Sequence, residues 1–327
     1  MYEGVKEITD LDSARFIEEK AREISDIVGE GVAINALSGG VDSSAVTMLG
    51  HKALGDRLKT YFVENGLMRK GEAEQIVGIF NDLGVPIELV DAREQFFAAL
   101  KGITDPEQKR EAVTQTFYKD VFGKLVRESD AKYLLQGTIL TDVDETAAGI
   151  KRQHNGFEQI GIDPQEAFGY KIIEPLVQIR KDGVRKVAEA AGLPESIYQR
   201  MPFPGPALAA RVIGEAIPER IETAREANYI VEEELAKEIA LGHISPFQYM
   251  AILHEDRVTG MRDGKRDFGL QIEIRCWDSV DARTAIPTDV SYEARRRIAN
   301  RLTKEVAGVV SVTYGITPKP PSTMEAI

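Results

Sequence analysis

The sequence predicts an α/β fold in which helices cover a parallel β-sheet. Apolar segments at 32–37, 58–66 and 86–92 alternate with segments of helical periodicity, and a fourth apolar segment spans 132–138. Strands that are buried on both faces are continuous apolar runs, and strands that alternate with helices form parallel sheets. We therefore expect four parallel strands in the first half of the chain.

The helices between these strands have recognisable ends. An amphipathic helix is expected at 13–28, and a second helix opens near Ser43, directly after the first strand. A third helix spans 72–83 and stops at Gly84, because glycine readily adopts the backbone conformation that ends a helix. A longer helical stretch, 107–128, leads to the fourth strand.

Three connections are expected to meet at one edge of this sheet. Ligands of open parallel sheets bind beyond the carboxyl ends of the strands. Segments 38–43, 64–66 and 136–138 each follow a predicted strand. The ligand site is therefore expected where these three segments gather.

The chain is expected to form two domains. Its 327 residues exceed the usual size of a single domain, and three prolines and a glycine lie between Pro202 and Ala207. These observations predict an N-terminal domain at 1–201 and a smaller α+β domain at 202–327. The elements expected in the second domain are helices at 218–240 and 292–306 and strands at 268–277 and 309–316.

Composition limits the possible functions. A net charge of -12 argues against a nucleic acid as the main partner, because phosphate backbones are bound by basic faces. The single cysteine, Cys276, lies in a strand-like segment, so disulfides and cysteine-ligated metal sites are excluded and a buried thiol is expected. The apolar runs are strand-sized and the N-terminus is acidic, so we expect a cytoplasmic chain without a signal peptide or a membrane span.

The segment INALSGGVDSSAV at 34–46 predicts a phosphate-binding loop. Two adjacent glycines let the backbone approach an anion, and the N–H groups at the start of the following helix can hold phosphate oxygens. The segment lacks both the lysine of G-x-x-x-x-G-K-[ST] and the dinucleotide pattern G-x-G-x-x-G, so those two nucleotide-binding types are excluded. The alternative interpretation is a tight glycine turn followed by a helix that a serine caps.

Asp42 is an acid inside this loop. Its carboxylate would repel a phosphate unless a cation lay between the two groups. Mg²⁺ prefers carboxylate and phosphate oxygens, so we predict that Mg²⁺ bridges Asp42 and the bound phosphates.

The motif LSGGVDSS after a first parallel strand resembles the pyrophosphate loop of the N-type ATP pyrophosphatase superfamily, whose members split ATP between the α and β phosphates. The resemblance is to the synthetase part of the GMP synthase family, and it spans nearly the whole chain. It is carried by the further segments FVENGLMRKGEAEQI, LLQGTILTDVDE, FPGPALAARVIGE and KPPSTME. It implies an adenine-nucleotide alpha-hydrolase-like fold. It also implies a ligase that adenylates the base carbonyl of xanthosine monophosphate (XMP), releases pyrophosphate and lets ammonia displace AMP.

The resemblance assigns ATP binding to the loop and to the end of the fourth strand. The residues so assigned are Ser38, Gly39, Gly40, Val41, Asp42, Ser43, Gly137 and Thr138. Lys181 is expected to reach the phosphates from the start of its own helix. One of Asp142 and Glu145 is expected to hold substrate or metal, and the alternative for both is a solvated loop face.

Helical and strand periodicity fails at about 142–170, and loops of this length are often active-site lids. The lid contains IKRQHNG, which resembles the family pattern I-K-S-H-H-N and keeps Lys151 and His154. The resemblance implies that Lys151 is a catalytic cation and that His154 is a second catalytic candidate. The alternatives are a solvated lysine and a structural or exposed histidine.

In this family the C-terminal domain binds XMP and forms a homodimer. The resemblance assigns substrate binding to Arg211, Lys319 and Glu325, and a C-terminal anchor is the alternative for Lys319. Departures from the family pattern cluster in this part of the chain. Ile286 stands where a histidine is usual, and Ala207 replaces a glycine. They motivate a second hypothesis, a paralogue that adenylates a different carbonyl acceptor.

The source of ammonia is expected to be another chain. Glutamine hydrolysis requires a cysteine nucleophile with a histidine partner, and one cysteine within a strand does not supply it. A separate glutamine amidotransferase subunit is therefore implied. Two further hypotheses remain. One is a tRNA-modifying thiolase or lysidine-type ligase, but the acidic charge and the lack of cysteine pairs argue against it. The other is a non-catalytic ATP-binding dimer.

Overall fold

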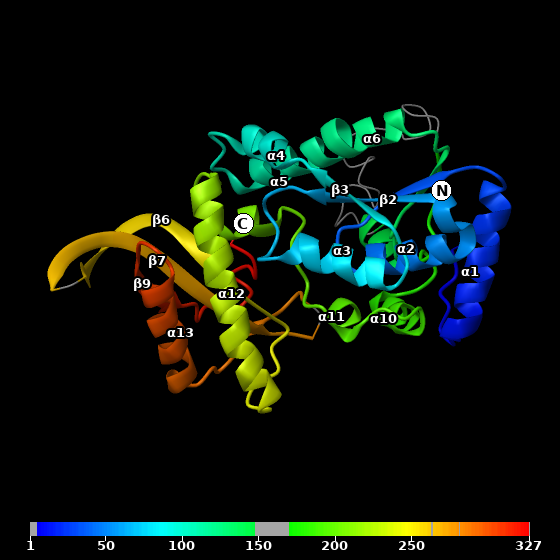
Figure 1. Ribbon diagram of the computed structural model, residues 1–327. Coiled ribbons are helices and arrows are strands. Elements are labelled where there is room, and N and C mark those ends of the chain that lie inside the picture. The colour runs from blue at the N-terminus through cyan, green and yellow to red at the C-terminus, as the bar shows by residue number, and fades with distance from the viewer. Residues whose placement is uncertain (1–4, 148–169, 263, 281, 327) are drawn as a thin grey trace. The chain divides into compact units, whose positions relative to one another are not determined.

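The computed structural model describes residues 5–147, 170–262, 264–280 and 282–326 (Figure 1). Contacts within the chain divide it into two compact units. The first comprises Met1–Glu64, Ala73–Ala92 and Thr114–Arg200, and the second comprises Asn65–Glu72, Arg93–Val113 and Met201–Ile327. The domain boundary expected after residue 201 stays a prediction, and the contacts assign two earlier segments to the second unit.

The first unit is built on a five-stranded parallel sheet, which confirms the predicted α/β class. The strand order is β3-β2-β1-β4-β5. The strands are β1 (Ala33–Ala36), β2 (Leu58–Glu64), β3 (Ile87–Asp91), β4 (Tyr133–Leu135) and β5 (Lys171–Ile173). The sequence did not predict β5, because its apolar run is only two isoleucines between Lys171 and Glu174.

Helices cover both faces of this sheet. Ile34 packs with Phe122 and Val126 on one face, whereas the next residue, Asn35, bonds to Thr47 of α2 on the other face. Successive side chains of a strand point to opposite faces, so one apolar run serves two helical layers. The helices that precede or follow these strands are α1 (Ser13–Val28), α2 (Val41–Leu54), η1 (Gly55–Arg57), α3 (Glu72–Asp82), α10 (Lys181–Ala190) and α11 (Glu195–Tyr198).

The prediction of a single α-helix at 107–128 is wrong for the middle of this stretch. The chain forms α5 (Pro106–Gln115), then the π-helix η2 (Thr116–Phe122), then α6 (Gly123–Glu128). A π-helix widens each turn, and the apolar spacing of a short stretch does not distinguish it from an α-helix. The sequence also missed α4 (Arg93–Leu100).

A further helix, α7 (Leu140–Ala147), occupies the start of the segment that was expected to be a loop. Asp142 Oδ2 accepts a hydrogen bond from Ile139 N at 3.0 Å. This contact satisfies a backbone donor at the beginning of the helix, as the acid of a capping box does. The remainder of the expected lid, residues 148–169, lies outside the described residues.

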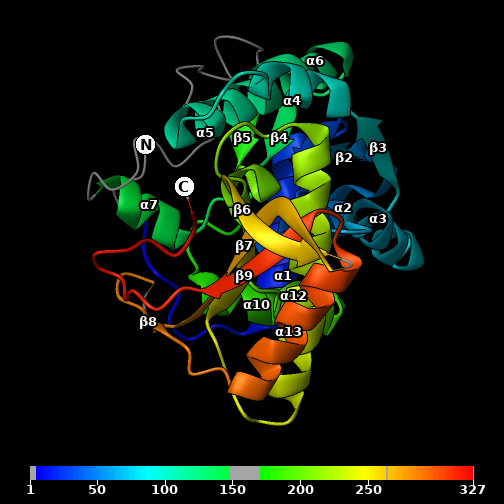
Figure 2. The ribbon, with the colours of Figure 1, turned by 90° about the vertical axis from the view of Figure 1, so that its left-hand side faces the viewer.

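The second unit contains a mainly antiparallel sheet (Figures 1 and 2). Helices α12 and α13 pack beside each other against this sheet, as Figure 2 shows. Cys276 is buried in β7, as the sequence predicts, and burial raises the pKa of its thiol to about 11. The elements are η3 (Ala207–Arg211), α12 (Pro218–Ala240), β6 (Gln248–Arg262), β7 (Lys265–Asp278), β8 (Ile286–Pro287), α13 (Tyr292–Glu305) and β9 (Val309–Tyr314).

Strand β6 was not predicted although it is 15 residues long. Its pairing with β7 shifts register between Leu253 and Arg257. The polar residues at this bulge interrupt the alternation of apolar and polar side chains by which a strand is recognised.

Within the described residues, no helix combines the length and the apolar character that a membrane crossing requires.

Candidate active site

The candidate site lies at the carboxyl ends of β1 and β4, where the strand order reverses. Ligands of open α/β sheets bind at such a point. The loop after β1 and the segment after β4 meet closely, since a Cβ added to Gly137 would lie 3.1 Å from the carbonyl carbon of Asp42. Glycine at this position therefore lets β4 approach the first turn of α2. Residues 64–66, the third expected segment, do not line the cavity described below.

Ser43 holds the glycine loop together. Its Oγ accepts a hydrogen bond from Ser38 N at 3.1 Å and donates one to the carbonyl oxygen of Gly40 at 3.0 Å. Gly39 has a φ of 75°, a conformation that favours glycine. A Cβ at Gly39 would also lie 3.0 Å from Nη1 of Arg200, which would have to move slightly, so the loop requires glycine mainly for its conformation.

The helix that follows the loop has an open N-terminus. Helix α2 begins at Val41, two residues before the predicted start, and its N-cap is Gly40, which makes no side-chain cap hydrogen bond. The first N–H groups of a helix have no partner inside the helix, and they carry partial positive charge. The alternative of a serine-capped turn therefore does not describe this loop, and the N–H groups suit an anion.

Asp42 lies in the first turn of α2. Its Oδ2 accepts a hydrogen bond from Lys181 Nζ at 2.6 Å, and the Asp42 side chain is 28% exposed. Its Oδ1 is covered and has no hydrogen-bond partner among the described residues. Burial raises the pKa of Asp42, and the ammonium group of Lys181 opposes the shift without cancelling it. One oxygen of this carboxylate is thus engaged, and the other can accept a cation.

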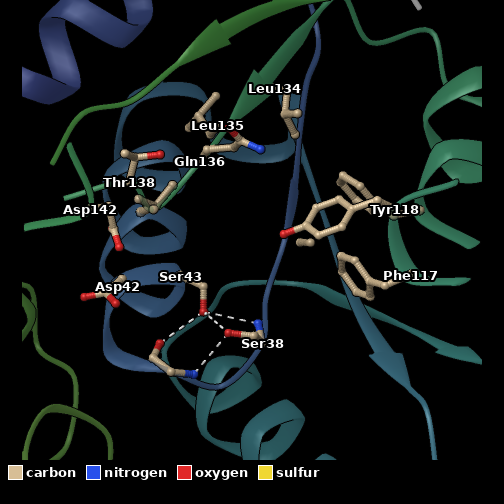
Figure 3. A pocket seen from close by; sticks show the side chains of 15 residues that line it. Ser38, Asp42, Ser43, Phe117, Tyr118, Leu134, Leu135, Gln136, Thr138 and Asp142 are labelled. Atoms are coloured by element: carbon tan, nitrogen blue, oxygen red, sulfur yellow. Dashed lines mark hydrogen bonds between the residues drawn. The ribbon is translucent and has the colours of Figure 1, made fainter. Parts of the chain in front are cut away.

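A cavity of about 270 Å³ opens between the loop and the end of β4 (Figure 3). Figure 3 shows Ser38, Ser43 and Asp42 on one side and the rings of Phe117 and Tyr118 on the other. Polar groups at one side and an apolar wall at the other are typical of small-molecule sites. The cavity is lined by Ala36, Ser38, Gly40, Asp42, Ser43, Val46, Phe117, Tyr118, Phe122, Leu134, Leu135, Gln136, Gly137, Thr138 and Asp142.

The aromatic wall of the cavity was not predicted from the sequence. Phe117 and Tyr118 lie on η2, and their rings meet edge to face with centroids 4.8 Å apart. Burial raises the pKa of Tyr118. Two adjacent aromatic residues that follow a helical segment are the only sequence signal. Their direction depends on the π-helical turn, which the sequence does not reveal.

Most of the predicted ATP-binding residues line this cavity, but Gly39, Val41 and Lys181 do not, and neither does Glu145, a candidate for substrate or metal. Asp142 lines the cavity, and Thr138 Oγ1 donates to Glu174 Oε1 at 2.5 Å. Lys181 is the first residue of α10 and reaches the loop through its ion pair with Asp42. Lys151 and His154, the predicted catalytic residues of the lid, lie outside the described residues.

The predicted substrate residues of the second unit form local contacts there. Arg211 is fully buried, and its Nη1 donates to Asn228 Oδ1 at 2.7 Å. Its Nε and Nη2 have no hydrogen-bond partner among the described residues, although Nε lies 3.5 Å from Glu325 Oε2. Lys319 Nζ donates to the carbonyl oxygen of Ala282 at 2.7 Å, so this lysine anchors the C-terminal segment in the structure.

The triplet Arg295, Arg296 and Arg297 does not act as one group. Arg297 forms ion pairs with Glu234 and Glu238 of α12, and Arg295 lies over the ring of Tyr314. Arg296 is exposed. The three side chains point in different directions from one helix, because consecutive helical residues do not share a face.

These features define a nucleotide-binding α/β protein with a phosphate loop. They are the parallel sheet, the uncapped helix after two glycines and the half-apolar cavity where the strand order reverses. The chain belongs to the GMP synthase family, in which its relatives form one subunit of the glutamine-hydrolyzing enzyme. Residues 233–326 match the family model described as the GMP synthase C terminal domain.

Full-length similarity supports this membership. The chain is 47% identical over 315 residues to one subunit of the GMP synthase (glutamine-hydrolyzing) of Archaeoglobus fulgidus, covering 96% of this chain and 99% of that one. It is 48% identical over 312 residues to the corresponding subunit from Pyrococcus furiosus, covering 95% and 96%. The solved structure of NMN synthetase from Francisella tularensis matches with a TM-score of 0.45 and 15% identity over 61% of this chain and 78% of that chain, a likeness too partial to bear on function.

Proposed function

We propose that this chain is the ATP pyrophosphatase subunit of a two-subunit GMP synthase. In this reaction the base carbonyl of XMP attacks the α phosphorus of ATP, pyrophosphate leaves, and ammonia displaces AMP to give GMP. The observation that carries the proposal is the similarity to GMP synthase subunits over nearly the whole of both chains. The loop, the open helix end and the cavity support it because they suit ATP.

The glycine loop binds the β and γ phosphates of ATP. Negative charge develops on the leaving pyrophosphate as the bond to the α phosphorus breaks, and donors fixed before the reaction stabilise that charge. The backbone N–H groups of 39–43 serve as these donors, and the hydroxyl of Ser38 adds another. Ser43 keeps the loop in shape through its bonds to Ser38 and Gly40.

Mg²⁺ is held by Asp42 together with the phosphates. Among the described residues there is no group of three or more His, Cys, Asp and Glu side chains that could hold a metal ion. Mg²⁺ at a nucleotide site needs only one or two carboxylates, because phosphates and water complete its coordination. The covered Oδ1 of Asp42, which accepts no hydrogen bond from the part of the chain that the structure describes, supports this role. Bound Mg²⁺ neutralises charge on the pyrophosphate leaving group.

The apolar side of the cavity receives the adenine base. Phe117 and Tyr118 provide flat apolar surface, and Leu134 and Leu135 of β4 lie among the other lining residues. The polar end of the same cavity contains Asp42, which supports a binding mode with the base and the phosphates at opposite ends of one site. Lys181 and, on the lid, Lys151 are the cations that stabilise the reacting phosphate.

The acceptor nucleotide binds to the second unit through Arg211, Lys319 and Glu325. Nη2 of Arg211 has no hydrogen-bond partner among the described residues and supports this role, because a buried unsatisfied donor is costly unless a ligand completes it. Asp142 and Glu145 remain candidates for contacts to the substrate or to metal, and His154 is the second catalytic candidate.

Two partners complete the enzyme. A separate glutamine amidotransferase subunit supplies ammonia, because the relatives of this chain are named as one subunit of a glutamine-hydrolyzing enzyme. A second copy of this chain binds through the C-terminal unit. Large apolar side chains exposed on that unit support the dimer, among them Met261, Phe268 and Tyr292.

The proposal is tested by incubating the purified chain with ATP, Mg²⁺, ammonium and XMP. We expect AMP, pyrophosphate and GMP in equal amounts, and ADP with orthophosphate would contradict the proposal. Turnover without XMP but with another carbonyl acceptor would favour the paralogue that Ile286 and Ala207 suggest. Equal background release of pyrophosphate by the wild type and by Lys151→Ala would favour a non-catalytic ATP-binding dimer.

A further inference from the structure

A chain of buried side-chain hydrogen bonds runs through the sheet behind the phosphate loop. Thr60 Oγ1 of β2 donates to Asn35 Oδ1 of β1 at 2.7 Å. Asn35 Nδ2 donates to Thr47 Oγ1 of α2, also at 2.7 Å. Thr47 Oγ1 in turn donates to the carbonyl oxygen of Ser43 at 2.8 Å. The bonds all run in one direction and end on the residue that holds the loop together.

The three polar side chains are inside the core of the first unit. Asn35 is 1% exposed, Thr47 is 0% exposed and Thr60 is 4% exposed. Asn35 and Thr60 are direct partners in the parallel pairing of β1 with β2, so their side chains lie together on the face that α2 covers. Strand β1 otherwise contributes only the apolar residues Ala33, Ile34 and Ala36. A polar group at this point costs free energy unless it is satisfied, and these hydrogen bonds satisfy the three side chains.

The network is linked to the loop by hydrogen bonds of Ser43. Ser43 accepts the last bond of the network on its carbonyl oxygen, and its Oγ bonds to both Ser38 and Gly40. Apolar packing tolerates small shifts of a helix, whereas a chain of short hydrogen bonds fixes both distance and direction. The first turn of α2 is thereby fixed relative to β1 and β2.

We infer that Asn35, Thr47 and Thr60 are positioning residues that hold Ser43, and through it the phosphate loop, in the geometry that binds pyrophosphate. The inference rests on the proposed function, because it requires that the loop bind the phosphates of ATP. The three residues do not touch the substrate, and they act through Ser43. Their loss should weaken binding of pyrophosphate and ATP and leave the acceptor site unchanged.

The decisive variant replaces the whole network by apolar groups of similar shape: Asn35→Leu, Thr47→Val and Thr60→Val together. Removing all partners of a buried network can be close to neutral for stability, whereas removing one leaves the others unsatisfied. We expect this triple variant to unfold near the wild-type temperature. It should bind inorganic pyrophosphate with Mg²⁺ about three- to tenfold more weakly by calorimetry, because the loop is no longer held in its binding geometry. The KM for XMP should not change.

Two controls separate positioning from general effects. Ser44→Ala removes a fully buried hydroxyl that has no hydrogen bond among the described residues, from the same helix, and should leave pyrophosphate affinity unchanged. Thr47→Ser keeps the hydroxyl and should retain most of the affinity that Thr47→Val loses. If the triple variant fails to fold, the comparison of Thr47→Ser with Thr47→Val tests the positioning role.

The outcomes distinguish this inference from the proposed function. A folded triple variant with wild-type affinity for pyrophosphate would show that the network only stabilises the core. A wild type that binds pyrophosphate and ATP but does not convert XMP would refute the proposed acceptor and leave the positioning role intact. A wild type that binds neither ATP nor pyrophosphate would overturn both.

Discussion

Lys181 Nζ lies 2.6 Å from Oδ2 of Asp42, across 139 residues of sequence. Lys181 is the first residue of α10, where the positive end of the helix disfavours a cation, and the side chain is 45% exposed. The ion pair therefore compensates a position that is poor for lysine. It also keeps a positive charge beside the carboxylate that we assign to Mg²⁺.

We predict that Asp42→Asn abolishes turnover and slightly stabilises the nucleotide-free protein. Burial raises the pKa of Asp42 above its ordinary value of 3.8, so the native state favours the protonated form. The unfolded chain loses this proton first, so stability falls as the pH rises from 3.8 to that raised pKa. Asparagine removes the cost, and we expect the Tm at pH 7 to rise by about 1–3 °C. Calorimetry and pyrophosphate release measure the two effects, and full activity would refute the Mg²⁺ role.

The glycine loop should not accept a side chain at Gly39. Gly39→Ala forces alanine into φ near 75° and places Cβ 3.0 Å from Arg200. We therefore expect the free energy of unfolding to fall by about 1–2 kcal/mol and ATP to bind more weakly. Gly78→Ala is the matched control, since a Cβ at Gly78 meets nothing within 4 Å and Gly78 lies inside α3. This control should gain about 0.5–1 kcal/mol. Equal effects at both glycines would contradict the argument.

Ala207 occupies a backbone conformation that favours glycine. Its φ is 52° and it is 2% exposed. We expect Ala207→Gly to stabilise the protein by about 0.5–1 kcal/mol in urea denaturation, since it removes a left-handed alanine. Ala209→Gly, in the same short helix and without positive φ, should destabilise it. A loss of stability in Ala207→Gly would show that the packing of the methyl group outweighs the backbone strain.

Glu273 should contribute stability that acid removes. Burial alone would raise the pKa of Glu273, but hydrogen bonds from His254 and Arg275 outweigh burial and hold the pKa at about 2, below the ordinary 4.5. The unfolded chain binds more protons than the native protein between these values. Stability from Glu273 is therefore complete above pH 4.5 and is lost as the pH falls toward 2.

Comparison of the wild type with Glu273→Gln tests this contribution. The free energy of unfolding should differ by about 1–3 kcal/mol at pH 7. Chemical denaturation at pH 3 to 7 should show the difference shrinking below pH 4.5. A difference that does not change with pH would mean that packing, and not charge, is responsible.

The strands that the sequence predicts are those with a strong local signal. Strands β1, β2 and β4 were predicted because buried parallel strands are continuous apolar runs. Strand β3 was predicted from the segment after Pro86, although its residues are half-buried or exposed. Strand β5 was not predicted because its apolar run is only two isoleucines between Lys171 and Glu174, and β6 was not predicted because polar residues at its bulge interrupt the alternation. The loop at 38–43 was predicted because its glycines and hydroxyls are adjacent in the chain.

The sequence by itself determined the parallel α/β class, the phosphate loop and the family, since each depends on residues that are close together in the chain or on their order. Only the tertiary structure decided that a π-helix turns Phe117 and Tyr118 into the cavity. It also decided that Lys181 meets Asp42, and that Thr60 and Asn35 support Ser43. These contacts join residues distant in sequence, and their existence depends on how helices pack against a sheet, which local periodicity does not encode.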